Sequence, residues 1–231
     1  MSANSFVHLL QFADGLFPAG GYAHSFGLET CVQSGRVSSA DDVAMFLRAH
    51  LEGSAAPTDA VVALCAARAA AGNPSDVGAI VRLDQMLDAL KPAAELREAS
   101  RQMGRQTLRV LKELSRDELV GRFAVALEEG ATRGHHAVVF GLAGAALQWA
   151  PEEMAAAFLY STSALIAGAA LRLMPLGQLA GQRILWSVGP LIATLSHEVQ
   201  TRSEEDIWSF APEIEIAAMR HESLEARLFR S

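Results

Sequence analysis

Cysteine and basic residues are scarce in this chain of 231 residues. The two cysteines, Cys31 and Cys65, lie far apart and form no C-x-x-C pair, so we expect buried thiols rather than disulfides or a zinc knuckle. Lysine and arginine number 19 against 26 acidic residues, and a net charge of −7 argues against non-specific nucleic-acid binding. The first residues lack the basic segment and apolar run of a signal peptide, which favours the cytoplasm.

Charge is absent altogether from residues 154–171. As a helix this stretch would be about 27 Å long, close to the apolar thickness of a bilayer, so a membrane span is one alternative. However, alanine and glycine dominate it, and residues 160–163 carry four hydroxyls in a row, where a span favours large aliphatic residues. We therefore predict an all-α, single-domain bundle over residues 1–231, built around a central apolar helix at about 151–173.

Periodicity, capping residues and breakers predict the remaining helices of this bundle. Gly53 and Pro57 are expected to end one helix and start the next, and Gly189-Pro190 is expected to kink or divide another. The segment 72–76 is the clearest surface loop in the first half of the chain. The expected helices cover residues 5–13, 22–33, 40–52, 57–71, 77–90, 92–114, 117–129, 135–149, 176–201 and 212–231.

Motifs for catalysis or metal binding are incomplete. Gly15 and Gly20 have the spacing of a phosphate-binding loop, but Gly21 and Tyr22 stand where that loop needs Lys and Ser or Thr. The neighbours His135 and His136 lack the i, i+4 spacing of helical metal ligands. The sequence thus indicates no catalytic residue, no metal site and no cofactor.

Three features favour an interaction protein. Arginines recur every fourth residue from 97 to 109, which produces either a basic stripe or an ordinary solvated face. Gln178 and Gln182 share one helix face and need partners in the core or in another subunit. The last five residues run from Arg227 through Leu228 and Phe229 to Ser231, and an exposed Phe with two Arg is typical of a docking anchor. A helical enzyme or small-molecule-binding protein, with a pocket lined by the glutamines and histidines, remains the alternative.

Four blocks of the sequence together carry a family resemblance. They are residues 17–29 (FPAGGYAHSFGLE), 100–105 (SRQMGR), 172–182 (RLMPLGQLAGQ) and 221–231 (HESLEARLFRS). In this order they resemble the UreF family of urease accessory proteins. The resemblance implies an all-α chaperone without catalytic activity, which dimerises, binds the accessory protein UreD (called UreH in some organisms) and recruits the GTPase UreG. That assembly delivers nickel to the urease apoprotein.

The resemblance also suggests which residues meet these partners. Tyr22 in the first block and Arg227 in the tail at about 221–231 are the principal candidates. The hypothesis extends to His24, Ser25 and Glu29, and to Leu228 and Phe229 beside Arg227. A role in GTP hydrolysis by UreG is a further hypothesis, for which Arg101 and Arg105 are the candidates.

We predict that Arg227→Ala, or removal of the last few residues, weakens assembly with UreD and UreG and leaves the isolated fold intact, because the tail is expected to act as a docking element. Co-purification of the altered chain with both partners measures this. A truncated chain that assembles like the wild type would contradict it.

Overall fold

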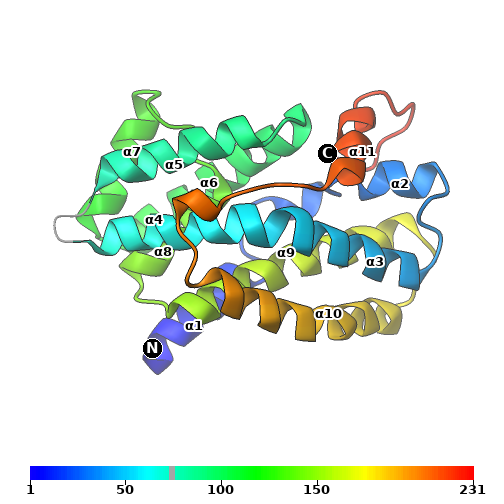
Figure 1. The fold of residues 1–231 in the computed structure, drawn as a ribbon, viewed down its shortest axis with the longest axis horizontal. Coiled ribbons are helices and arrows are strands. Elements are labelled where there is room, and N and C mark those ends of the chain that lie inside the picture. The colour runs from blue at the N-terminus through cyan, green and yellow to red at the C-terminus, as the bar shows by residue number, and fades with distance from the viewer. Residues whose placement is uncertain (73–75) are drawn as a thin grey trace.

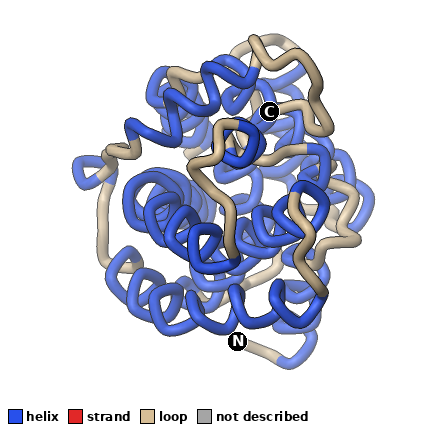
Figure 2. Tube along the Cα trace, turned by 90° about the vertical axis from the view of Figure 1, so that its right-hand side faces the viewer, coloured by secondary structure: helices blue, strands red, loops and turns tan. Residues whose placement is uncertain are grey.

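The protein is built from helices throughout the part that the structure describes. The computed structural model describes residues 1–72 and 76–231, and within these ranges it contains no strand (Figure 2). The all-α prediction is therefore confirmed, whereas residues 73–75 of the predicted surface loop lie outside the described residues. The helices are α1 (Ala3–Ala13), α2 (Leu28–Gln33), α3 (Ala40–His50), α4 (Val61–Ala71), α5 (Val77–Leu90), α6 (Ala94–Leu114), α7 (Glu118–Glu128), α8 (His136–Ala146), α9 (Pro151–Leu173), α10 (Gln178–Val199) and α11 (Pro212–His221), with the short helices η1 (Gly21–Ala23), η2 (Leu51–Ala60) and η3 (Glu204–Asp206).

One long rod, formed by α3, η2 and α4, crosses the middle of the molecule (Figure 1). It starts at a capping box in which Ser39 and Asp42 satisfy each other's backbone N–H groups. The expected break between Gly53 and Pro57 is wrong, because the chain stays helical through η2, which is a π-helix with Pro57 inside it. The wider i→i+5 bonding of a π-helix provides a register in which a residue without N–H is tolerated.

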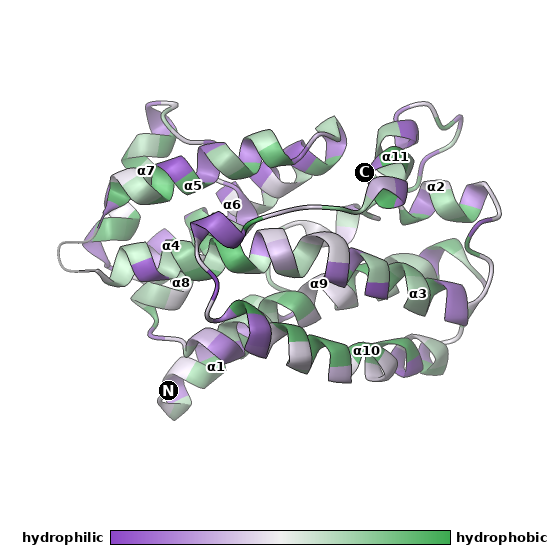
Figure 3. Ribbon diagram, viewed as in Figure 1, coloured by the Kyte–Doolittle hydropathy of each residue, from purple (hydrophilic) through white to green (hydrophobic). Residues whose placement is uncertain are grey.

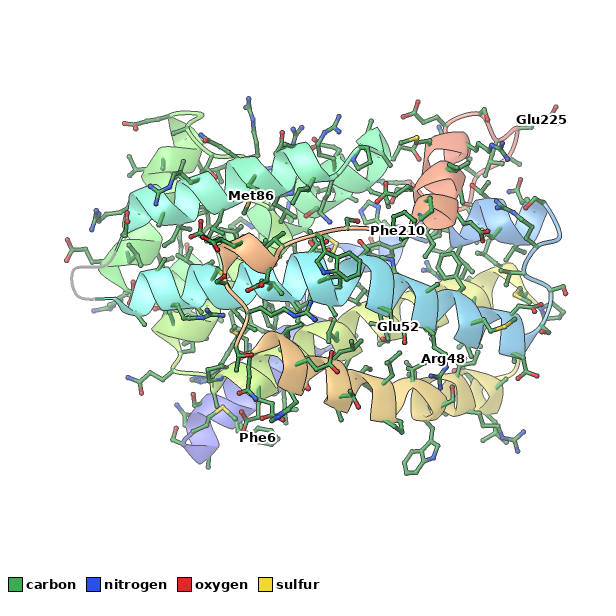
Figure 4. All side chains as sticks on the ribbon, viewed as in Figure 1. Phe6, Arg48, Glu52, Met86, Phe210 and Glu225 are labelled. Atoms are coloured by element: carbon green, nitrogen blue, oxygen red, sulfur yellow. The ribbon has the colours of Figure 1, made fainter. Side chains whose placement is uncertain are left out.

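An extended strap, residues 207–211, lies across this rod (Figure 1). The N–H of Phe210 in the strap donates to the carbonyl of Gly53 at 2.7 Å. The Thr58 hydroxyl donates to the carbonyl of Trp208. The irregular part of the rod is thus the part that holds the strap, while the Phe210 side chain remains 75% exposed on the surface (Figure 4).

Helices α4 and α8 form the most closely packed pair in the core. Residues 137–144 of α8 are all buried, and so is the segment of the rod from Val61 to Ala66. A Cβ atom at Gly141 would lie 2.1 Å from the carbonyl oxygen of Ala63, so only glycine allows the two backbones to approach this closely.

Helix α9 spans the predicted residues, Pro151–Leu173, and contacts α1, α2, α3, η2 and α10. It is long and apolar enough to cross a bilayer, but half of its most apolar window is buried inside the bundle. The expectation that neighbours cover it on every side is wrong, since Glu153 and Tyr160 are exposed. The core is therefore shared between α9 and the more deeply buried pair of α4 and α8.

Three further helix predictions need correction. The helix expected over 22–33 is divided, because Phe26 and Gly27 both have positive φ angles, 56° and 84°, and α2 starts only at Leu28. Helix α10 is not divided at Pro190; it runs without a break, and hydrophobic and hydrophilic residues alternate along it (Figure 3). Helix α11 ends at His221, and residues 222–231 form an irregular tail.

We expect Gly141→Ala to lower the free energy of unfolding by about 1–3 kcal/mol or more, because the new methyl group would force α4 and α8 apart. Gly121→Ala on α7 is the matched control, since a Cβ there meets no atom within 4 Å. That change should stabilise the protein by about 0.5–1 kcal/mol, the helical advantage of alanine over glycine. Urea denaturation measures both, and equal effects of the two substitutions would contradict the packing argument.

Candidate functional site

The tail folds back onto the block that contains Tyr22, His24, Ser25 and Glu29. The Arg230 N–H donates to the carbonyl of Ala23 at 2.9 Å, and the Ser25 N–H donates to the main-chain oxygen of Ser231 at 2.6 Å. The side-chain amide of Gln33 on α2 donates to the carbonyl of Ala226 at 2.9 Å. We call residues 21–29, Glu95, His221 and 226–231 the tail site. It joins the first and last of the four blocks noted in the sequence.

Glu29 lies at the centre of the tail site and is only 2% exposed. Its two carboxylate oxygens accept the N–H groups of Leu228 at 2.7 Å and Phe229 at 3.1 Å. Burial alone would raise the pKa of Glu29, but the N–H of Leu228, the His221 ring and the N–H of Phe229 together hold that pKa below its usual value. The buried side chain is therefore an ionised acceptor that fixes the backbone of the tail.

His221 connects Glu29 to a second carboxylate. Its ring is buried, with Nε2 2.9 Å from Oε2 of Glu29 and Nδ1 2.6 Å from Oε2 of Glu95 on α6. The other oxygen of Glu95 accepts from the guanidinium of Arg227 at 2.9 Å. Three elements, α2, α6 and α11, are thereby tied to the tail through charged hydrogen bonds.

His24 and Ser25 hold the last residue rather than a partner. His24 Nδ1 lies 2.8 Å from the Ser231 hydroxyl, and the Ser25 hydroxyl donates to the main-chain oxygen of Ser231 at 2.8 Å. Burial, with the charges of Arg230 and His221, lowers the pKa of His24 to about 4, so its imidazole is neutral near pH 7. Both side chains are almost fully buried and unable to reach another protein directly.

The exposed part of the tail site consists of Tyr22 and Leu228, which are 68% and 62% exposed, and the half-exposed Arg227. Phe229 was expected to be exposed, and this is wrong: its ring is buried beneath the guanidinium of Arg172, 4.1 Å from the ring centroid. Arg172 also donates to the carbonyl of Tyr22. Arg172, which begins the third block, was not among the candidate residues expected from the sequence.

A family model described as UreF matches residues 37–189 of this chain. A urease accessory protein UreF from a Bacillus species is 30% identical over 228 residues, covering 99% of this chain and all of the relative. The proteins of the same name from Lachnoclostridium phytofermentans and a Nostoc species are 32% and 31% identical, with at least 98% of every chain covered. The chain belongs to the UreF family of urease accessory proteins.

The arginine stripe of this UreF family member is engaged by its own carboxylates. Nε of Arg101 donates to Asp88 at 2.8 Å, and both Arg101 and Arg105 pair with Glu98. These contacts lie along α5 and α6. The carboxylate of α6 that takes part in the tail site is a different one, Glu95. The structure therefore does not bring Arg101 and Arg105 together with Tyr22 and Arg227.

Gln178 and Gln182 are exposed on α10, so the expectation that they pack in the core is wrong. A small pocket inside the bundle, about 60 Å³, is lined instead by residues including His50, Lys91, His136 and Glu215. A volume of this size holds a few water molecules, and His50 Nδ1 and Glu215 Oε2 have no hydrogen-bond partner in the described structure. The alternative of a ligand pocket at the two glutamines thus finds no support.

The histidine pair on α8 serves the fold. His135 lies 3.0 Å from the Ser100 hydroxyl and 2.9 Å from Asp88, and His136 contacts Thr107. Within residues 1–72 and 76–231, no three His, Cys, Asp or Glu side chains are placed to hold a metal ion.

Glu29→Gln should lower the free energy of unfolding by about 1–3 kcal/mol near pH 7, because an amide N–H₂ would replace an acceptor and face the tail's N–H groups. Because the pKa of Glu29 is lowered in the folded state, its ionised carboxylate stabilises the protein fully at pH values above the unfolded-state pKa of about 4.3. This stabilisation is lost as the pH falls through the folded-state pKa. Urea denaturation as a function of pH measures this.

The matched control is Glu225→Gln, since Glu225 lies at the outer edge of the same tail (Figure 4). This exposed substitution should change stability by no more than about 0.5 kcal/mol. The same geometry means that deleting residues 227–231 would remove two N–H donors from Glu29 and the Ser231 contacts of His24 and Ser25. A truncated chain is therefore expected to be destabilised, contrary to the expectation from sequence, and Arg227→Ala is the cleaner variant.

Proposed function

We propose that this protein is a non-catalytic chaperone of urease maturation in the cytoplasm, which bridges UreD (UreH) and the GTPase UreG so that nickel is inserted into the urease apoprotein. Membership of the UreF family supports a role in urease maturation. The observation that carries the bridging role is the tail site, where buried hydrogen bonds fix a chain end that presents Tyr22, Arg227 and Leu228 outward.

The chemistry of this exposed group fits a protein partner. Tyrosine and arginine are the side chains that most often dominate binding energy, and the exposed part of the tail site has one of each, Tyr22 and Arg227, together with the exposed Leu228. Their backbone is held by Glu29 and by Arg172, so little conformational entropy is lost when a partner binds. We infer that Glu29, His24 and Ser25 act indirectly, by positioning the residues that touch the partner.

We also propose that the protein works as a homodimer within the assembly. Leu179, Gln182 and Trp186 share one face of α10, and Leu179 and Trp186 are 63% and 87% exposed. Exposed apolar side chains beside amides that lack core partners are typical of an interface between subunits. Any effect on GTP hydrolysis by UreG we assign to the docked complex, because Arg101 and Arg105 are already paired.

Leu228→Ala and Tyr22→Ala should each weaken binding to UreD or UreG by roughly tenfold or more, the loss expected of a central contact residue. Quantitative co-purification or titration of the isolated partners measures the loss. The matched control is Leu114→Ala, since Leu114 is likewise about half exposed (55%). Leu114 is the last residue of α6, whereas Glu95, the tail-site residue on the same helix, lies at its start. Equal binding by the three variants and the wild type would refute the docking role.

A further inference from the structure

A groove of about 640 Å³ lies between the rod and the strap, and no tail-site residue lines it. One wall is a single face of α3 and the start of η2, whose residues recur at steps of three and four: Asp42, Met45, Ala49 and Glu52. The other wall is the strap with the first residues of α11. Figure 4 shows Glu52 and Phe210 on the same side of the molecule, where the strap crosses the rod.

The middle of the groove is apolar. Phe46 and Ile214, both part of the hydrophobic core, line it from below the surface. Its walls hold large apolar side chains in solvent, since Met45 is 61% exposed, Trp208 is 45% exposed and Phe210 is more exposed than either. Exposed apolar side chains that gather along a hollow are typical of an interaction site. Methionine and aromatic residues in particular suit a groove that receives an amphipathic helix.

Negative charge prevails at the rim of the groove. Among the described residues that line it, Asp42, Glu52 and Glu213 are acidic and Arg36 is basic. Neither Glu52 nor Glu213 forms an ion pair with any residue that the structure describes. The guanidinium of Arg48 on α3 is engaged with α10, where it donates to a main-chain carbonyl at 2.9 Å. The rim therefore favours a partner with positive charge.

This charge discriminates between possible occupants of the groove. In a two-fold dimer centred on the groove, the same carboxylates of two copies would face one another, which is repulsive. A membrane surface with anionic lipids would be repelled in the same way. A helix with apolar residues on one side and lysine or arginine on the other matches both the apolar middle and the acidic rim.

We propose that the groove between α3 and the strap is a second docking surface, which binds a basic amphipathic helix of a partner protein. The apolar side of that helix packs against Met45 and Phe210, and its basic side chains pair with Glu52 and Glu213. The proposed bridging role needs two separate surfaces, and this groove provides one in addition to the tail site. Only that assignment rests on the proposed function, because the preference for a basic helix follows from the groove's own residues.

Two designed peptides of about 14 residues test the groove. One carries leucine on one helical face and lysine on the other, and the second has glutamate in place of every lysine. Each is titrated into the full-length protein at about 0.15 M salt, where the screening length of about 8 Å limits the influence of distant charges. The lysine peptide should bind and shift the methyl resonance of Met45 in the protein labelled at its methionine methyl groups.

The glutamate peptide should bind more weakly by roughly tenfold or more, because its charges meet carboxylates at the rim. Equal binding of the two peptides would overturn the proposal. Binding of the lysine peptide without a shift at Met45 would overturn it as well, since the peptide would then occupy another surface.

Variants at exposed positions sharpen the test and preserve the fold. Phe210→Ala keeps the N–H that donates to Gly53 and should weaken binding of the lysine peptide by roughly tenfold, and Glu52→Lys should weaken it several-fold. The matched controls are Trp186→Ala, at an exposed aromatic residue of α10, and Glu129→Lys, at the end of α7. Neither position lines the groove, so neither change should alter the affinity. Equal losses in test and control variants would overturn the proposal.

Sedimentation of the protein alone distinguishes a partner surface from a contact between copies. Phe210→Ala should leave the association state unchanged, and a change would assign the groove to a second copy and overturn the proposal. The groove and the tail site also fail separately. Peptide titration uses no urease partner, so absence of binding would leave the role of Tyr22 and Leu228 untouched, and unchanged partner binding by Leu228→Ala would leave the titration valid.

Discussion

The buried carboxylate of Glu29 is the constraint on which the functional end of this protein depends. An ionised group with 2% exposure requires donors, and the described structure supplies them from the tail's backbone and from His221. The same bonds that satisfy the charge determine the path of residues 226–231. The exposed position of Leu228 follows from that path, so the docking role proposed for the tail site depends on the same contacts as its stability.

The rest of the bundle makes this arrangement possible. The rod of α3, η2 and α4 keeps its irregular turn at Pro57, where the strap at 207–211 is held, and the strap leads directly into α11. Helix α11 then delivers His221 to Glu29 and Glu95. A local departure from α-helical geometry at residues 51–60 thus contributes to the placement of the chain's end.

Several buried polar side chains of this UreF family member are engaged within the fold. His24 and Ser25 contact the last residue, Ser231, and His135 contacts Asp88. The groups available to other molecules are exposed tyrosine, leucine, tryptophan and arginine side chains on the outer surface. Such side chains are typical of protein interfaces.

The sequence by itself determined the all-α class, the bounds of α9 and the two blocks that form the tail site, because helical periodicity and motifs are local. It did not determine that Pro57 lies inside a continuous rod or that Phe229 is buried, since both depend on distant partners, the strap and Arg172. Only the tertiary structure decided that Glu29 and His221, 192 residues apart, share a hydrogen bond. Pairing over such a distance carries no local signal, because the charge of Glu29 is satisfied only after the chain has folded.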